Sequence, residues 1–307
     1  TLTVTGQVKL NSATGNNSSC QVTGAGQLSC GSVLVGTNLA PTAIRTTIMS
    51  ASIAALNITG NLTVSSYRGL SDTRLINSTF NLQSGVVDVN GTLAMTNENA
   101  VNTCTFTMAS GAQSGTLRVS AASPFSVTTT GTDNLVLHGT NSLVHYDGAN
   151  QEIRATTYTH LELSGSGTKT IAASTTVNVN GNLTNNSSFV LTVGTSTTST
   201  WLVMKGDITN GLSGVIDASA SYTRFMFNSD VAQTFTNNGS VVSPISSFDV
   251  SNTHPSGLTL AGTNGMTVTR ANLFYGTVNN AGMITLGTGG TSYATVQRGV
   301  AGNTSPA

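Results

Sequence analysis

Carboxylate side chains are the first residues of this sequence that suggest chemistry. Paired Asp or Glu groups carry acid–base catalysis in polysaccharide hydrolases, and a base beside cationic groups serves the lyases. The chain has only eleven carboxylates, none in a DxD or DD cluster, and only three lysines. The best grouping for an acidic site is Asp147, Glu152 and Arg154. The sequence therefore predicts no catalytic residues and no enzyme.

Histidines are the next candidates, as metal ligands. His138, His145 and His160 are close in sequence, and Asp147 and Glu152 lie between them. Their spacing matches no known ligand pattern. We therefore expect hydrogen bonding at the surface or between neighbouring strands, with no bound metal or cofactor.

Three cysteines are present, and none forms a CxxC pair, which argues against zinc and thioredoxin-type sites. Cys20 and Cys30 flank a short Gly-containing segment, so either a disulfide between them or two buried free thiols fits the sequence. A disulfide closing such a loop would contribute roughly 2–3 kcal/mol. Cys104 is expected to be a small core residue.

The composition excludes several classes of protein and fold. Only 7% of the residues are charged and the net charge is zero, so a nucleic-acid binder is not expected, because phosphates need surplus Lys or Arg. No apolar run approaches the roughly 20 residues of a membrane-spanning helix. Thr, Ser, Asn and Gly, which are poor helix formers, make up about half of the chain.

Alternation of apolar residues predicts strands. Four segments share the pattern apolar-x-apolar-x-Gly-x-apolar, which we interpret as a strand, a bend and a second strand. They are LTVTGQV (2–8), LNITGNL (56–62), VVDVNGTL (86–93) and VNVNGNL (177–183). The shared glycines, Gly6, Gly60, Gly91 and Gly181, would allow a positive φ at the bend. Residues 41–56 fit either a short helix or a further strand with a loop.

The scarcity of proline favours strands that are paired on both sides, because proline removes a ladder hydrogen bond. Only five prolines are present, and few aromatic residues, which suggests a thin aliphatic core. The prediction is an all-β, right-handed parallel β-helix with irregular coils of about 20–30 residues, in which stacked Asn and Thr hydrogen-bond along the axis. We expect one continuous solenoid over 1–298 and a polar tail or linker at 299–307. The alternative is tandem β-sandwich domains.

One stretch of the chain carries a more specific pattern. A Gly-x-x-Gln segment is followed by a tyrosine, alternating leucines, SGSGTKT and an apolar-x-apolar-x-Gly-x-Leu strand. The matching residues are Gly148, Gln151, Tyr158, Leu161, Leu163, Gly165, Gly167, Lys169, Val179, Gly181 and Leu183. This pattern resembles the repeats of large surface proteins of Bacteroidota that are exported by type IX secretion. The resemblance implies a β-helical surface, adhesin or filament protein outside the cell, without catalytic residues.

This interpretation leads to two main functional hypotheses. In the first, the chain is an extracellular structural protein whose copies associate end to end into a cell-surface filament, because neither end of the solenoid carries a charge cluster to repel another chain. In the second, it is a section of a surface adhesin that binds glycans or surfaces. A polysaccharide-degrading enzyme is the third and weakest hypothesis. Thr1 resembles a processed start of a secreted chain, and a fragment of a longer chain fits equally.

Overall fold

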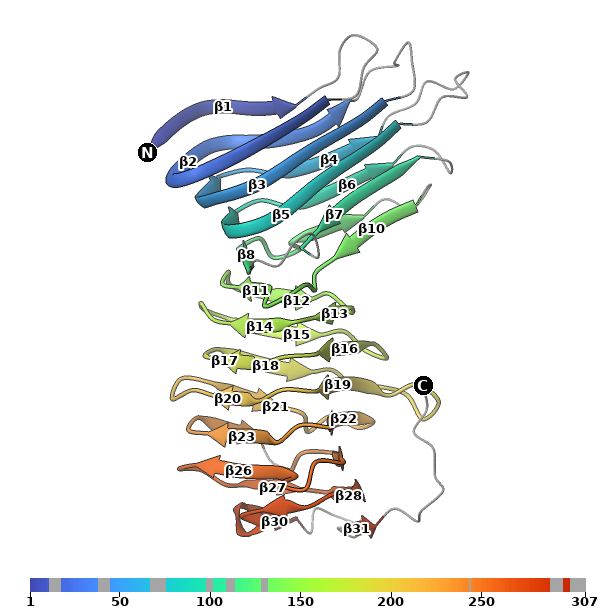
Figure 1. Ribbon diagram of the computed structural model, residues 1–307. Helices are drawn as coiled ribbons and strands as arrows, with labels where there is room; N and C mark the ends of the chain where they lie inside the picture. The colour runs from blue at the N-terminus through green and yellow to red at the C-terminus, as the bar shows by residue number, and fades with distance from the viewer. Residues whose placement is uncertain are drawn as a thin grey trace. The chain divides into compact units, whose positions relative to one another are not determined.

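The computed structural model describes residues 1–10, 18–37, 45–66, 76–97, 102–108, 114–127, 132–242, 244–287 and 295–298. The chain forms two compact units, Thr1–Gly148 and Ala149–Ala307, called unit 1 and unit 2 below. Figure 1 shows that strands stack coil upon coil within each unit. Continuity of one solenoid over 1–298 stays a prediction. The tail at 299–307 lies outside the described residues.

Unit 1 is built of three parallel ladders, and long strands pass from one ladder to the next through a bend. Successive coils are offset by about 25 to 32 residues. Its strands are β1 Leu2–Leu10, β2 Ser18–Thr37, β3 Arg45–Ile58, β4 Leu62–Ser66, β5 Ile76–Val89, β6 Leu93–Asn97, β7 Thr103–Thr107, β8 Gly115–Val119, β9 Phe125–Val127, β10 Thr132–Val136 and β11 Leu143–Tyr146.

Unit 2 has shorter strands in three main ladders, with coils offset by about 18 to 27 residues. The first ladder is β12 Gln151–Ile153, β15 Thr168–Ile171, β18 Ser188–Leu191, β21 Val215–Asp217 and β24 Ser240–Val242. The second is β13 Thr157–Tyr158, β16 Thr176–Val179, β19 Thr200–Met204, β22 Thr223–Ser229, β25 Phe248–Asn252, β28 Arg270–Tyr275 and β31 Thr295–Arg298. The third is β14 His160–Leu163, β17 Leu183–Asn185, β20 Ile208–Asn210, β23 Gln233–Asn237, β26 Leu258–Gly262 and β29 Val278–Asn279. A short pair, β27 Met266–Val268 and β30 Ile284–Leu286, and the 3-10 turn η1 Ala281–Met283 complete the unit.

Every strand pair described for the chain is parallel, so each unit is a β-solenoid. The prediction of an all-β parallel β-helix is confirmed. Tandem β-sandwiches would need antiparallel sheets and are not what the chain forms. The ambiguous segment 41–56 lies in strand β3 from Arg45 onward, so its helical interpretation was wrong. The β-branched and small residues of that segment favour a strand.

Inward-facing residues of like character stack in rows along each unit. One row of unit 1 runs through Leu28, Leu56, Val87, Leu117 and Val144, all buried. Such a row keeps its apolar face toward the core only if the register between coils is kept, because a shift of one residue would turn the side chains outward.

Large rings contribute more to the core than the composition suggested. Phe80 and Phe106 stack on neighbouring coils of unit 1, with ring centroids 5.5 Å apart. In unit 2, four buried phenylalanines form a cluster with ring centroids 5.2 to 6.2 Å apart. They are Phe225, Phe227, Phe235 and Phe248. The expectation of a purely thin aliphatic core was therefore wrong.

The shared motif needs glycine for a different reason from the one predicted. None of Gly6, Gly60, Gly91 and Gly181 has a positive φ. At Gly60, a Cβ atom would lie 2.6 Å from the carbonyl oxygen of Gly31 on the preceding coil. The amide of Gly60 donates a hydrogen bond to that same oxygen at 2.7 Å. The motif therefore needs glycine because two backbones approach closely at the corner.

The side chain of the residue after the motif glycine forms a hydrogen bond with the following coil. The side-chain oxygen of Asn61 accepts a hydrogen bond from the amide of Thr92 at 2.9 Å, and that of Asn182 accepts one from the amide of Asp207 at 3.0 Å. Asp207 in turn accepts from the amide of Thr234 at 2.7 Å. These contacts satisfy backbone donors that the bends remove from the strand ladders.

Stacked asparagines run through the interior of unit 2, as the sequence predicted. Asn185, Asn210 and Asn237 are fully buried. Asn185 Nδ2 donates to Asn210 Oδ1 at 2.9 Å, and Asn210 Nδ2 donates to Asn237 Oδ1 at 2.8 Å. Each amide also donates to a backbone carbonyl, as Asn210 does to Ser240. The row is a continuous polar network inside the core.

Replacing the middle asparagine tests this network. Asn210→Ala leaves the Oδ1 of Asn237 without its donor and removes an acceptor of Asn185, so we expect a loss of about 2–3 kcal/mol of unfolding free energy. Urea unfolding measures this loss. Thr209→Val, on the exposed side of the same strand, is the control and should stay within about 0.5 kcal/mol of the parent. Equal effects of the two variants would contradict a stabilising ladder.

Candidate functional site

A charged ladder lies on neighbouring coils of unit 1. Register places Asp88 of β5 beside Arg118 of β8, and Arg118 beside His145 of β11. Arg118 Nη1 is 3.7 Å from an Asp88 oxygen, and Arg118 Nη2 donates to an oxygen of Asp147, which follows β11. The other Asp147 oxygen accepts from Ser120 Oγ at 2.7 Å. We call Asp88, Arg118, His145 and Asp147 the charged ladder.

The electrostatics of this ladder are set by its partial burial. Burial raises the pKa of Asp88, and the nearby Asp147 raises it further, whereas Arg118 and His145 lower it. Asp88 Oδ1 and Arg118 Nε are both inaccessible and without a hydrogen-bond partner. Arg118 bridges two carboxylates from different coils, and this arrangement ties the coils together.

The predicted acidic set is divided by the fold. Asp147 belongs to the charged ladder of unit 1, whereas Glu152 and Arg154 belong to unit 2. Glu152 lies on the exposed face of β12, beside Thr170. The carbonyl of Arg154 accepts a hydrogen bond from the buried Tyr158 hydroxyl at 2.8 Å. The partner of Asp147 that sequence reasoning missed is Arg118, with Asp88 beyond it.

The histidines take the roles expected of surface groups. His138 is exposed, and His145 stands in the charged ladder. His160 Nδ1 accepts a hydrogen bond from the amide of Asn182 at 3.0 Å, and His254 Nδ1 accepts one from the amide of Ser256 at 3.1 Å. Within the described residues, no three His, Cys, Asp or Glu side chains gather in a way that could hold a metal ion.

All three cysteines are free thiols in the structure. Cys20 and Cys30 lie in the same strand, β2, in register with Met49 and Ile58 of the next coil. Of the two alternatives that the sequence left open, a disulfide or two free thiols, the structure has the free thiols. Burial raises the pKa of the Cys30 thiol, which disfavours the reactive thiolate. Cys104 is fully buried, as expected for a core residue.

The segment that resembles surface-protein repeats forms the first coils of unit 2. Lys169 is fully buried, and its ammonium donates to the carbonyls of Ala149 and Ser166 at 2.8 and 3.1 Å. Gly165 and Gly167 have positive φ values and form the turn that brings one of these carbonyls into place. The lysine of the motif thus has a structural role, because it satisfies carbonyls at a tight turn.

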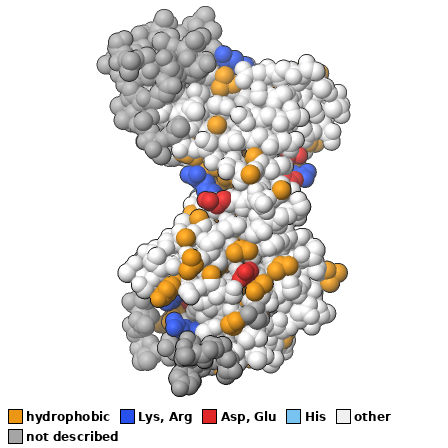
Figure 2. All heavy atoms as spheres, turned by 180° about the vertical axis from the view of Figure 1, so that it is seen from behind, with side chains coloured by type: hydrophobic (Ala, Val, Ile, Leu, Met, Phe, Trp, Pro, Cys, Tyr) orange, Lys and Arg blue, Asp and Glu red, His pale blue; other side chains and the backbone are white. Residues whose placement is uncertain are grey.

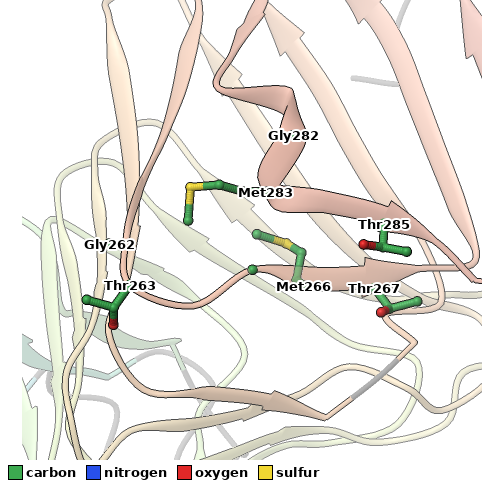
Figure 3. Close-up of a pocket in the computed structure, with 8 residues that line it drawn as sticks. Gly262, Thr263, Met266, Thr267, Gly282, Met283 and Thr285 are labelled. Atoms are coloured by element: carbon green, nitrogen blue, oxygen red, sulfur yellow. The ribbon is translucent and has the colours of Figure 1, made fainter.

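A shallow open groove of about 390 Å³ lies beside β27 and β30 in unit 2. Figure 3 shows the Met266 and Met283 side chains next to each other there, with Thr263, Thr267 and Thr285 around them. No ionisable side chain is among its lining residues. The groove therefore offers thioether and hydroxyl contacts but no acid or base.

The open edges of the ladders are the other surface with binding capacity. Among the described residues, β1 pairs only with β2, β29 only with β26, and β30 only with β27. Each edge therefore presents backbone donors and acceptors along one side. Figure 2 shows that charged side chains form only small, separate groups on the face in view. Backbone pairing and stacking, rather than charge, are what these edges can supply.

The chain is thus an all-β protein of the parallel solenoid class. Comparison with protein-family models, curated proteins and solved structures gave no match. In the part of the chain that the structure describes, no helix has the length and apolar character to cross a membrane.

The raised pKa of Asp88 gives a testable pH dependence. Folded protein keeps a proton on Asp88 at pH values where the unfolded chain, with a pKa near 3.8, has lost it. The stability that Asp88 contributes is therefore greatest at low pH and declines as pH rises through this window. Asparagine does not ionise, so the unfolding free energy of the parent minus that of Asp88→Asn should decline over the same window.

Urea unfolding of both proteins from about pH 3 to about pH 8 measures this difference. Titrations of the other ionisable groups largely cancel in the comparison. A difference that stays constant, or grows as pH rises, would contradict the burial of the Asp88 carboxyl.

Proposed function

We propose that the protein is a non-enzymatic, extracellular structural protein, a subunit of a cell-surface filament formed by end-to-end association of β-solenoids. The observation that carries the proposal is that parallel edges with few charges are open at β1, β29 and β30. β1 is unpaired on one side, and β29 and β30 are each paired on one side only, within the described residues. Adding a coil to such an edge repeats the contact that already joins every neighbouring pair of coils.

The charge of the chain supports self-association. The net charge is zero, so copies do not repel one another. Over its nine residues β1 contains one charged side chain, Lys9, and no proline. Charges and prolines are among the usual devices that prevent strand edges from pairing. β1 does have a register shift against β2, between Val4 and Gln7. A heterologous contact of this kind, repeated from copy to copy, yields an open fibre.

The charged ladder fits this structural role better than a catalytic one. Arg118 lies between two carboxylates, and Ser120 occupies the second oxygen of Asp147. All of these contacts connect one coil with another. A catalytic carboxylate pair would instead need open space for substrate between its two groups.

A section of a surface adhesin is the second candidate, and two exposed side chains favour it. Val193 and Tyr222 are 53% and 51% exposed. They lie on neighbouring coils of unit 2, because the amide of Gly194 donates to the carbonyl of Ser221. Tyr222 also holds a φ of 60°, a costly conformation for a bulky residue that is often found at functional sites. An exposed ring of this kind can stack on a sugar face.

The assembly state of the purified chain tests the filament proposal. We expect polymers that lengthen with protein concentration, seen by sedimentation velocity and negative-stain microscopy. Because backbone pairing rather than charge would join the copies, polymers should persist from about 0.05 to about 0.5 M salt, where charge-driven contacts are screened. Single rods at every concentration would contradict the filament, and glycan binding that Tyr222→Ser removes would then favour the adhesin.

A further inference from the structure

The corner motif shows where another coil must cross the chain. At Gly91 and Gly181, as at Gly60, the place of a Cβ atom is taken by atoms of the preceding coil, which include its backbone and, at these two corners, the side chains of Asn61 and His160. The carbonyl oxygen of Gly60 lies 2.5 Å from that place at Gly91, and the carbonyl oxygen of Thr159 lies 2.8 Å from it at Gly181. Both glycine amides donate to these same oxygens. The motif glycine thus marks a close crossing by the coil in front of it.

Gly6 carries the same motif, but no described coil crosses it. Among the described residues, no atom lies within 4 Å of the place where its Cβ atom would be, and its φ is not in the left-handed region. Neither space nor conformation within this chain requires glycine at this position. Its own carbonyl fills the corresponding place at Gly31, 3.0 Å from the Cβ position. Gly6 therefore belongs to the same series of corners, and no coil among the described residues crosses it.

The apolar side chains of β1 are also less buried than their neighbours on the next coil. Leu2 is 65% exposed although it heads the core row that continues through Leu28. Val4 and Val8 are only half-buried, whereas Cys30 and Val33, their neighbours on β2, are buried. A further coil would bury these apolar side chains and pair the free side of the strand.

We propose that a coil of a second copy of this chain crosses β1 at Gly6, as β1 itself crosses β2 at Gly31. This proposal rests on the proposed filament and names the corner at which two copies meet. A second copy is the occupant because the same chain offers parallel edges of the required kind in β29 and β30, each paired on one side only among the described residues. With Lys9 as its one charged side chain, β1 also suits a backbone partner rather than an ionic one.

The substitution Gly6→Val separates the contact between copies from the fold of the single chain. Valine suits a strand, and the space around Gly6 is open within one copy. We expect an unchanged melting temperature and association weakened by about tenfold or more, because the added side chain meets the crossing backbone. Sedimentation velocity across a concentration series measures the association. Thr209→Val, exposed on a strand paired on both sides, is the matched control and should associate like the parent.

Gly60→Val shows what the clash does when the crossing coil belongs to the same chain. It should lower the melting temperature, because the Cβ site lies 2.6 Å from a carbonyl oxygen. A parent that never associates would overturn the filament and the Gly6 contact together. A parent and a Gly6→Val variant that associate equally would overturn only the Gly6 contact and leave the filament standing. If Gly6→Val also loses its fold, the open corner assumed here is wrong.

Discussion

Hydrogen bonding between successive coils is the constraint on which the rest of each unit depends. A residue has its spatial neighbours about 18 to 32 positions away in sequence, directly above and below it. The residue at one position is therefore stacked on the residues at the equivalent positions of the neighbouring coils. Apolar rows form a core, asparagine rows form a hydrogen-bonded network, and glycines mark the corners where backbones come closest.

Stacking also explains why the chain has so few charges. Like charges on adjacent parallel strands repel one another, so a row tolerates a charge only beside an opposite or neutral group. The described ion pairs follow this rule. Arg118 stands between Asp88 and Asp147, and Arg224 contacts the buried Asp249 of the next coil and lies over the ring of Trp201. Neutral Thr, Ser and Asn avoid the problem, which accounts for a composition with only 7% charged residues.

Alternation and composition were sufficient to predict the parallel solenoid and the asparagine row, because both are local or compositional signals. Register was not predictable, since it depends on the length of each loop between strands. For that reason the pairing of Asp88 with Arg118, which are 30 residues apart, could not be found from the sequence. The glycines were found but misinterpreted, because a close approach between coils leaves the same sequence signal as a bend with positive φ. The phenylalanine cluster of unit 2 was missed because its members come from three different strands.

The direction of the hydrogen bonds has a mechanical consequence. In each unit the backbone bonds between coils point along the stacking direction, so a force applied in that direction loads the coils in series. The buried amides of Asn185, Asn210 and Asn237 lie in the same line of load, away from competing water. A pulled unit is therefore expected to fail first at a junction that lacks such internal links, and to shed whole coils rather than stretch evenly.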